Sequence, residues 1–302
     1  MEPARDHSRI RRGENLELKS QATPASNTTY VVLGVPVSAV QIPGVVDRIE
    51  EWIARREACR YIAVTGMHGV MLAQHDPGYL GVLSDAAMVV PDGMPLVWAG
   101  RRLGFDLPRR VYGPELMETF CARTRSKGYR HFFYGAKPGV ADELARRLAE
   151  RYPGLQVAGV CSPPFRPLTD EEDRSIVRAI EDSKADIVWV GLGAPKQEVW
   201  MHQHQGRLSA PVLVGVGAAF DFHAGRVPSA PEWMREHGFE WAFRLALEPR
   251  RLWKRYLVYG SEFALRMALE VLRSRGGRPP VDLASRAHPN PTANPSERIP
   301  DA

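Results

Sequence analysis

Short apolar runs alternate with amphipathic stretches along residues 29–230, and this alternation constrains the fold more than any other feature. Runs such as RYIAVTG (60–66) and DIVWVG (186–191) are mostly apolar and have the length of strands. Stretches such as IPGVVDRIEEWIARRE (42–57) instead carry apolar residues at helical spacing. Apolar strands separated by helices predict an α/β, Rossmann-like core, with a mostly parallel sheet covered by helices on both faces.

Three details of this pattern make specific predictions. YVVLGVPV (30–37) predicts one strand, and GVMLAQHDPGYLGVLSDA (69–86) predicts a helical stretch. TDEEDRSIVRAIEDSKA (169–185) predicts a helix with Thr169 as its N-cap and acidic residues in its first turn.

The chain outside the predicted core differs in composition. Residues 1–28 and 275–302 are polar, and the second stretch is rich in proline, so we expect two disordered tails. Residues 231–274 have no strand-like run and interleave aromatic residues and leucine with arginine and lysine, which predicts a basic helical appendage. Such helices can dock on an anionic membrane, bind nucleic-acid phosphates, or pack on the core with their arginines in water. All three interpretations stay open at this point.

Composition narrows the class of protein. With 44% hydrophobic and 25% charged residues, a largely disordered chain is excluded. Three separate cysteines (Cys59, Cys121 and Cys161) fit a reducing compartment better than a disulfide framework or a zinc site. No apolar segment approaches the roughly 18 residues of a membrane span, and no signal peptide is recognisable. We therefore expect a cytoplasmic protein, with binding to a membrane surface left open.

Polar residues and glycines follow several predicted strands. These positions are Thr65 to His68, Asp92-Gly93, Gly191 to Glu198 and Gly215 to Gly225, with RRVYGPE (109–115) before a predicted helix. Ligands of α/β sheets lie at the carboxyl ends of the strands, and glycines there let backbone N–H groups approach an anion. A nucleotide diphosphate is a reasonable ligand, although the chain has no complete GxGxxG fingerprint and no GxxxxGK[ST] loop.

Individual polar residues in these segments admit two interpretations each. Asp92 suits a general base in apolar surroundings or a turn-forming Asp-Gly pair. Asp221 can accept from a ribose or uracil, or from backbone amides that hold its loop. His68 and His223 can act as acid–base groups or as structural hydrogen-bonding residues.

No metal site is expected. The histidines of HQH (202–204) do not share a helix face, and DEED (170–173) is explained by a first helical turn. A DxD-type motif is absent, so arginine is expected to neutralise any phosphate group that leaves.

Five motifs, taken in order, resemble the WecG/TagA/CpsF family of bacterial glycosyltransferases over about residues 30–258. They are VVPDGMPLVWAGRR (89–102), RRVYGPELM (109–117), WVGLGAPKQEVWM (189–201), VGVGAAFDFHAGRVPSAPEWMREHGFEWAFRL (214–245) and EPRRLWKRYL (248–257). The resemblance implies transfer of a hexose or N-acetylhexosamine from a UDP-sugar to an undecaprenyl-diphosphate-linked saccharide in cell-surface polysaccharide synthesis. It also implies an inverting, metal-independent reaction without a cofactor, at the inner face of the cytoplasmic membrane.

The resemblance also implies roles for individual residues. Asp92 corresponds to the general base and Thr65 to a threonine near the sugar, while Arg244 and Arg251 correspond to appendage arginines that stabilise the leaving diphosphate. The implied substrate-binding residues are His68, Arg110, Tyr112, Gly113, Gly193, Gln197, Glu198, Asp221, Lys254 and Arg255.

Three positions depart from the common family pattern. Met67 stands where many members have asparagine, Ser229 where an arginine is frequent, and Lys254 where arginine would bind phosphate in bidentate fashion. The donor sugar is therefore left open.

Two other classes of protein remain as alternatives. A dinucleotide-dependent oxidoreductase would need the full glycine fingerprint, and a nucleic-acid-binding module would not need the polar strand ends. We expect no nucleic-acid partner, and a homo-oligomer remains open.

Overall fold

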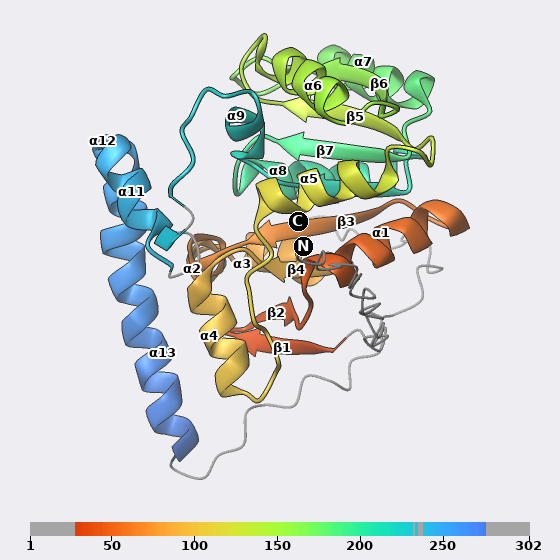
Figure 1. Cartoon of the computed structure of the whole chain (residues 1–302). Helices are drawn as coiled ribbons and strands as arrows, with labels where there is room; N and C mark the ends of the chain where they lie inside the picture. Colours follow the sequence, from red (N-terminus) through yellow and green to blue (C-terminus); the bar gives the residue numbers. More distant parts are fainter. Residues whose placement is uncertain (1–27, 232, 235–237, 276–302) are drawn as a thin grey trace, which may run out of the picture.

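A six-stranded parallel sheet forms the centre of the protein (Figure 1). The computed structural model describes residues 28–231, 233–234 and 238–275. The strands lie in the order β4-β3-β8-β7-β5-β6. Their bounds are β3 (Arg60–Thr65), β4 (Met88–Pro91), β5 (Arg130–Gly135), β6 (Gln156–Cys161), β7 (Ile187–Gly191) and β8 (Val212–Gly215). The predicted α/β class with a mostly parallel sheet is confirmed.

Helices cover both faces of this sheet, as predicted. The core helices are α1 (Ile42–Arg55), α2 (Met67–His75), α3 (Pro77–Ser84), α4 (Met94–Arg102), α5 (Gly113–Thr124), α6 (Val140–Arg151), α7 (Asp170–Ser183), α8 (Lys196–His204) and α9 (Ala219–His223). On one face Ile49, Phe120 and Leu144 of α1, α5 and α6 pack with Trp189 of β7. On the other face α7 and α8 cover β5, β7 and β8 through a separate apolar cluster. Burial on both faces explains why the strands are apolar throughout.

The prediction of one strand over residues 30–37 is wrong. The segment folds into an antiparallel hairpin of β1 (Thr29–Val32) and β2 (Val35–Ser38). Leu33 and Gly34 form the turn with φ values of 48° and 81°. Glycine adopts this left-handed conformation without steric cost, so Gly34 is the residue that permits the reversal.

The helical stretch predicted for residues 69–86 is divided into α2 and α3. Asp76 lies between them in an extended conformation, because Pro77 disfavours the helical conformation in the residue before it. Its carboxylate accepts hydrogen bonds from the amides of Gly78 and Tyr79 and so caps α3. At α7 the predicted N-cap is confirmed, because the Thr169 hydroxyl and Glu172 form a reciprocal capping box.

The appendage is helical, as predicted, and lies along one side of the core (Figure 1). It consists of α11 (Glu240–Leu247), α12 (Pro249–Trp253), the π-helical turn η1 (Lys254–Val258) and α13 (Tyr259–Arg275). Phe263 of α13 is buried among core residues, and Glu262 bonds His75 of α2 at 3.1 Å. Apart from Thr28 and Arg275, the two predicted tails lie outside the described residues.

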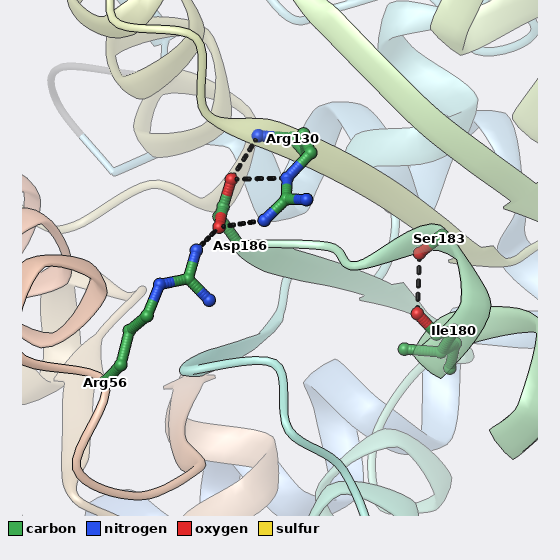
Figure 2. Close-up of polar contacts among 5 residues, drawn as sticks. All are labelled: Arg56, Arg130, Ile180, Ser183 and Asp186. Carbon is green, nitrogen blue, oxygen red and sulfur yellow. Dashed lines mark hydrogen bonds and ion pairs between the residues drawn. The ribbon is translucent and has the colours of Figure 1, made fainter.

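A buried ion cluster ties the strands together at the end of the sheet opposite the glycine-rich strand ends (Figure 2). Asp186, directly before β7, is only 3% exposed. Its carboxylate accepts from the backbone N–H of Arg130 at 2.8 Å and from the Arg130 Nε and Nη2 at 3.1 and 3.0 Å. Arg56, just after α1, contributes a second guanidinium. Nearby the Ser183 hydroxyl donates to the Ile180 carbonyl at the end of α7.

Asp186→Ala is expected to lower the free energy of unfolding by about 2–3 kcal/mol, because a buried backbone amide and two guanidinium groups lose their acceptor. Partial exposure of both arginines limits the effect. Urea denaturation measures it, with the exposed neighbour Asp182→Ala as the matched control, expected within about 0.5 kcal/mol of the parent. Equal effects of the two substitutions would contradict a stabilising cluster.

Candidate active site

Two cavities meet at the carboxyl ends of β3 and β4. The polar cavity, about 890 Å³ in volume, runs along the ends of β3, β5, β7 and β8 and is bordered by the appendage arginines. The apolar cavity, about 630 Å³, lies between α4 and α13. The residues that line both cavities are Gly66, His68, Asp92, Tyr112, Arg244 and Arg255. We call these six residues the junction.

Asp92 lies at the junction, directly after β4. Its backbone N–H donates to the Thr65 carbonyl at 2.9 Å, so its main chain continues the pairing of β4 with β3. The Oδ1 atom is buried and has no hydrogen-bond partner among the described residues. Burial raises the pKa of Asp92 to about 7, against the lowering effects of Arg110, Arg255 and a hydrogen bond from the Gly113 amide. A carboxylate with a free oxygen and a near-neutral pKa can accept a proton from a bound hydroxyl group.

The alternative of an Asp-Gly turn is not favoured by the backbone. Gly93 has a φ of −143°, which is an extended conformation open to any residue, and it serves as the N-cap of α4. The buried Oδ1 of Asp92 has no hydrogen-bond partner among the described residues, so a turn does not occupy this oxygen.

Glu240 of α11 connects the appendage to the junction, and the sequence analysis did not identify it. Its carboxylate forms an ion pair with Arg110 and accepts from the Tyr112 hydroxyl at 3.2 Å. The Arg110 guanidinium also lies 4.2 Å from the centre of the Tyr112 ring. In the sequence, the only sign that Glu240 has a special role is that it is an acidic residue within a basic helical segment. The ion pair between Arg110 and Glu240 therefore holds the appendage against the core. Arg110 also lines the apolar cavity.

Two appendage arginines reach the junction with unused donors. The Nε atoms of Arg244 and Arg255 are buried and lack a hydrogen-bond partner in the part of the chain that the structure describes. Arg244 lies over the ring of Phe222, 5.6 Å from its centre. Arg251 is exposed, pairs with Glu248 and lines the polar cavity. These guanidinium groups can bind the oxygens of a diphosphate.

Lys254 lies away from the junction. Its ammonium group is 5.6 Å from the centre of the Trp253 ring, and its side chain is absent from the described walls of both cavities. The sequence placed it near Arg255 along the chain, but successive residues of a helical segment face different directions.

The two candidate histidines differ in surroundings. Burial and the nearby Arg255 lower the pKa of His68 to about 4, so its imidazole is neutral at pH 7. Its Nδ1 atom is buried without a partner among the residues described, and its ring packs edge-on against Tyr259 of α13 at 5.4 Å. His68 is thus a neutral hydrogen-bonding group at the junction. His223 instead bonds the Pro114 carbonyl at 2.9 Å, which favours the structural interpretation for that residue.

The GAPKQE motif forms one wall of the polar cavity. Gln197 is 3% exposed, and its Oε1 accepts from the Gly193 amide at 3.1 Å. Its Nε2 donates to Glu198 Oε1 at 2.8 Å. Gly193 and Gln197 line the cavity, as does Asp221 of α9, whereas Glu198 is fully buried behind them. Gly113 begins α5 and contributes its amide to Asp92.

The histidines of the HQH segment have other partners. His204 contacts the Trp200 carbonyl at 2.7 Å and Asp173 at 2.8 Å. Within the described ranges no group of three or more His, Cys, Asp or Glu side chains is placed to hold a metal ion. None of the described helices combines the length and the apolar character needed to cross a bilayer.

Comparison with known proteins connects this geometry to a family. The profile of the glycosyl transferase WecG/TagA/CpsF family matches residues 30–277. The chain is 33% identical over 185 residues (61% of this chain, 70% of the relative) to an N-acetylglucosaminyldiphosphoundecaprenol N-acetyl-beta-D-mannosaminyltransferase of Bacillus spizizenii. Enzymes of the same name from Bacillus subtilis (29% over 230 residues, 76% and 87% covered) and Staphylococcus aureus (30% over 229 residues, 75% and 88% covered) are also similar.

The family match includes the sheet, the junction and the appendage, and the curated relatives are named as glycosyltransferases. The chain therefore belongs to the WecG/TagA/CpsF family and is a glycosyltransferase.

Proposed function

We propose that the protein transfers a hexose or N-acetylhexosamine from a UDP-sugar to an undecaprenyl-diphosphate-linked saccharide, with inversion at the anomeric carbon. One observation carries this proposal: the Asp92 carboxylate, whose Oδ1 has no hydrogen-bond partner among the described residues, lies where a polar cavity and an apolar cavity meet. A reaction between a nucleotide sugar and a lipid-linked sugar needs a base at such a boundary.

The polar cavity has the chemistry of a nucleotide-sugar site. Gly193 and Gly217 line this cavity and have positive φ values, and without side chains they let the main chain approach a bound diphosphate closely. Asp221 can accept from ribose hydroxyl groups, and Gln197 offers an oriented amide. The UDP-sugar donor is our inference from these groups and the arginines beside them.

The apolar cavity suits the lipid-linked acceptor. Its walls carry Met94 and Trp98 from α4 and Phe263, Met267 and Val271 from α13. The curated relatives act, by their names, on N-acetylglucosaminyldiphosphoundecaprenol. A polyprenyl chain can bury apolar surface between the two helices while the sugar end of the acceptor reaches Asp92.

The reaction follows from these positions. Asp92 accepts the proton of the acceptor hydroxyl as its oxygen attacks C1 of the donor sugar, and the C1–O bond to UDP breaks. Attack from the face opposite the leaving group inverts C1. Arg244, Arg251 and Arg255 stabilise the charge that grows on the departing diphosphate. Met67, at the start of α2, lines the apolar cavity.

This function predicts a pH dependence of kcat/KM for the free enzyme. Burial raises the pKa of Asp92 to about 7, and the base must be ionised. We expect kcat/KM to fall about tenfold per pH unit below pH 7 and to level off above it. Initial rates measured in overlapping buffers test this, and a rate that is constant down to pH 5 would contradict a base with this pKa.

The appendage supports peripheral binding to the inner face of the cytoplasmic membrane. Leu265, Leu269 and Leu272 of α13 are 61%, 43% and 62% exposed and recur at helical spacing. They form a stripe separate from Phe263 and Met267, which face the apolar cavity. An exposed apolar stripe close to arginines is typical of a helix at an anionic lipid surface.

Replacing these three leucines by serine is expected to weaken binding to vesicles of anionic phospholipid by about a hundredfold, since each leucine contributes about 1 kcal/mol when buried. Vesicle sedimentation measures the change. Val157→Ser on β6, an exposed apolar position on the far edge of the sheet, is the control. Unchanged sedimentation of the triple variant would contradict this docking surface.

Binding of nucleotides separates the proposed function from its alternatives. UDP is expected to raise the melting temperature, whereas NAD and duplex DNA are expected to leave it unchanged. Stabilisation by NAD alone would favour an oxidoreductase, and stabilisation by DNA alone a nucleic-acid-binding module.

A further inference from the structure

Phe165 is an exposed aromatic residue on the wall of the polar cavity, and no step of the proposed reaction uses it. It lies in the loop between β6 and α7, and its side chain is 89% exposed, more than any other large apolar side chain in the described ranges. It belongs to none of the described apolar clusters. Because ligand pockets are lined by aromatic side chains, an aromatic ring left in water on a cavity wall is a candidate ligand contact.

The loop that carries Phe165 is held at both ends. At its start the Ser162 hydroxyl donates to a backbone carbonyl at the end of β5 at 3.1 Å. Directly after Phe165, the Arg166 guanidinium donates to both carboxylate oxygens of Glu172 at 2.6 and 2.7 Å. The intervening segment PPFRP (163–167) is rich in proline, which fixes the backbone φ. A ligand that binds this ring therefore has little loop entropy to remove.

Lys196 lies beside the Phe165 ring. It is the first residue of α8, and its ammonium group lies 4.8 Å from the centre of the ring. Lys196 lines the polar cavity as well. Its flexible four-carbon stem lets the ammonium group move from the ring to an acceptor at the edge of a stacked ligand. The two residues thus offer a planar apolar surface and a charged hydrogen-bond donor at one place.

The position of this pair relative to Asp92 suits the base of a nucleotide sugar. Lys196 follows β7 and Asp92 follows β4, so they start from strand ends that are three strand spacings apart, about 14 Å. Gly193 and Asp221, which the proposed function assigns to the diphosphate and the ribose, follow β7 and β8. A nucleotide sugar laid along the strand ends, with its sugar at Asp92, therefore has its base at Phe165.

We propose that Phe165 and Lys196 form the subsite for the nucleobase of the donor, in which the base stacks on the Phe165 ring and the Lys196 ammonium donates to a carbonyl oxygen of the base. This inference rests on the proposed function, because it places one part of the UDP-sugar of that proposal. Stacking on an aromatic ring supplies affinity for any base. The ammonium group supplies selectivity, since uracil carries carbonyl groups and adenine carries none.

Phe165→Ala is expected to weaken binding of UDP about five- to a hundredfold, the usual effect of removing a ring that stacks on a base. Binding of inorganic pyrophosphate, which has no base, should match that of the parent, and Phe165→Tyr, which keeps the ring, should retain most of the UDP affinity. The matched control is Phe239→Ala, which removes another exposed phenylalanine, absent from the described walls of both cavities. Isothermal titration calorimetry measures these affinities. Equal UDP affinities of Phe165→Ala and Phe239→Ala would overturn the proposal.

Lys196→Met is expected to reduce the selectivity among bases. We expect the parent to bind UDP about tenfold more tightly than ADP, the usual effect of a hydrogen bond from a charged group. Methionine cannot donate, so the Kd values of UDP and ADP should approach each other in this variant. Lys137→Met, which removes a second lysine from the same cavity wall, controls for loss of charge and should keep the parent preference. Equal preference for UDP in the two variants would contradict the role of Lys196.

Fluorescence separates failure of this inference from failure of the proposed function. In Phe165→Trp the emission of the new indole, taken as the difference from the parent, should be quenched by UDP and not by pyrophosphate, whereas Phe239→Trp should respond to neither. If UDP binds the parent without quenching Phe165→Trp, the base subsite is wrong and the proposed donor stands. If UDP quenches Phe165→Trp but no UDP-sugar yields a product, the proposed transfer is wrong and the base subsite stands.

Discussion

Replacing Asp92 by asparagine is expected to lower kcat for glycosyl transfer by about 10²- to 10⁴-fold, the usual contribution of a positioned general base. Asparagine has nearly the same shape but cannot accept the proton of the acceptor hydroxyl. The KM values for donor and acceptor should change little, because binding depends on the arginines, the glycine turns and the apolar cavity. Steady-state rates with saturating substrates measure the loss.

The same substitution is expected to leave the fold as stable as before, or slightly more stable. The pKa of Asp92 is raised to about 7 in the folded protein, so the folded state favours the protonated carboxyl. The protonated Asp92 carboxyl therefore stabilises the folded state fully below the unfolded pKa of about 3.9, and this stabilisation is lost as the pH rises through 7. An uncharged asparagine avoids that loss at neutral pH.

Asp106→Asn, an exposed position outside the described cavity walls, is the matched control and should retain the parent rate and melting temperature. Near-normal turnover by Asp92→Asn would exclude its role as the base. An unfolded Asp92→Asn protein would contradict the stability argument.

Arg255→Ala should produce the second large effect, a fall in kcat of about 10²- to 10³-fold. Arg255 borders both cavities beside Asp92 and has a buried Nε without a partner among the described residues. Its charge is therefore available to the diphosphate leaving group, whose negative charge increases as the C1–O bond breaks. Arg255→Lys should restore part of the rate, since lysine keeps the charge but loses the bidentate geometry.

Arg250→Ala is the control for this prediction. Arg250 lies five residues earlier in the same basic segment, is exposed, and is absent from the described walls of both cavities. It should retain parent activity on a soluble short-chain acceptor. If Arg250→Ala and Arg255→Ala reduce kcat equally, the appendage acts through its overall charge and not through a defined contact with the diphosphate.

The sequence predicted the α/β class and most of the elements because that information is local. Uninterrupted apolar strands and helical spacing are properties of neighbouring residues. The position of β8 between β3 and β7 depends on contacts between distant segments, and no local pattern specifies it. The hairpin at residues 29–38 was missed because its turn, Leu33-Gly34, interrupts the apolar run by only one glycine.

The candidate site, too, could be predicted where the information is local and not where it depends on distant segments. The segments that carry Thr65, Asp92 and Gln197 were predicted because strand ends converge in a parallel sheet, and the family resemblance singled out Thr65 and Gln197 within them. The structure brings all three residues to the polar cavity. Glu240 was missed because its importance comes from Arg110 and Tyr112, which lie more than a hundred residues away in sequence. Lys254 shows the converse, since a charge close in sequence to Arg255 need not face the same cavity.

Transfer of a sugar from a UDP-sugar to a short-chain polyprenyl-diphosphate-linked N-acetylglucosamine tests the central claim most directly. The parent enzyme is incubated with a panel of UDP-hexoses and UDP-N-acetylhexosamines, and the lipid products are resolved by mass spectrometry. The proposed function predicts a product heavier by one sugar residue for at least one donor, an equimolar release of UDP, and no product with Asp92→Asn. Absence of a heavier lipid with every donor, or equal product formation by Asp92→Asn, would contradict it.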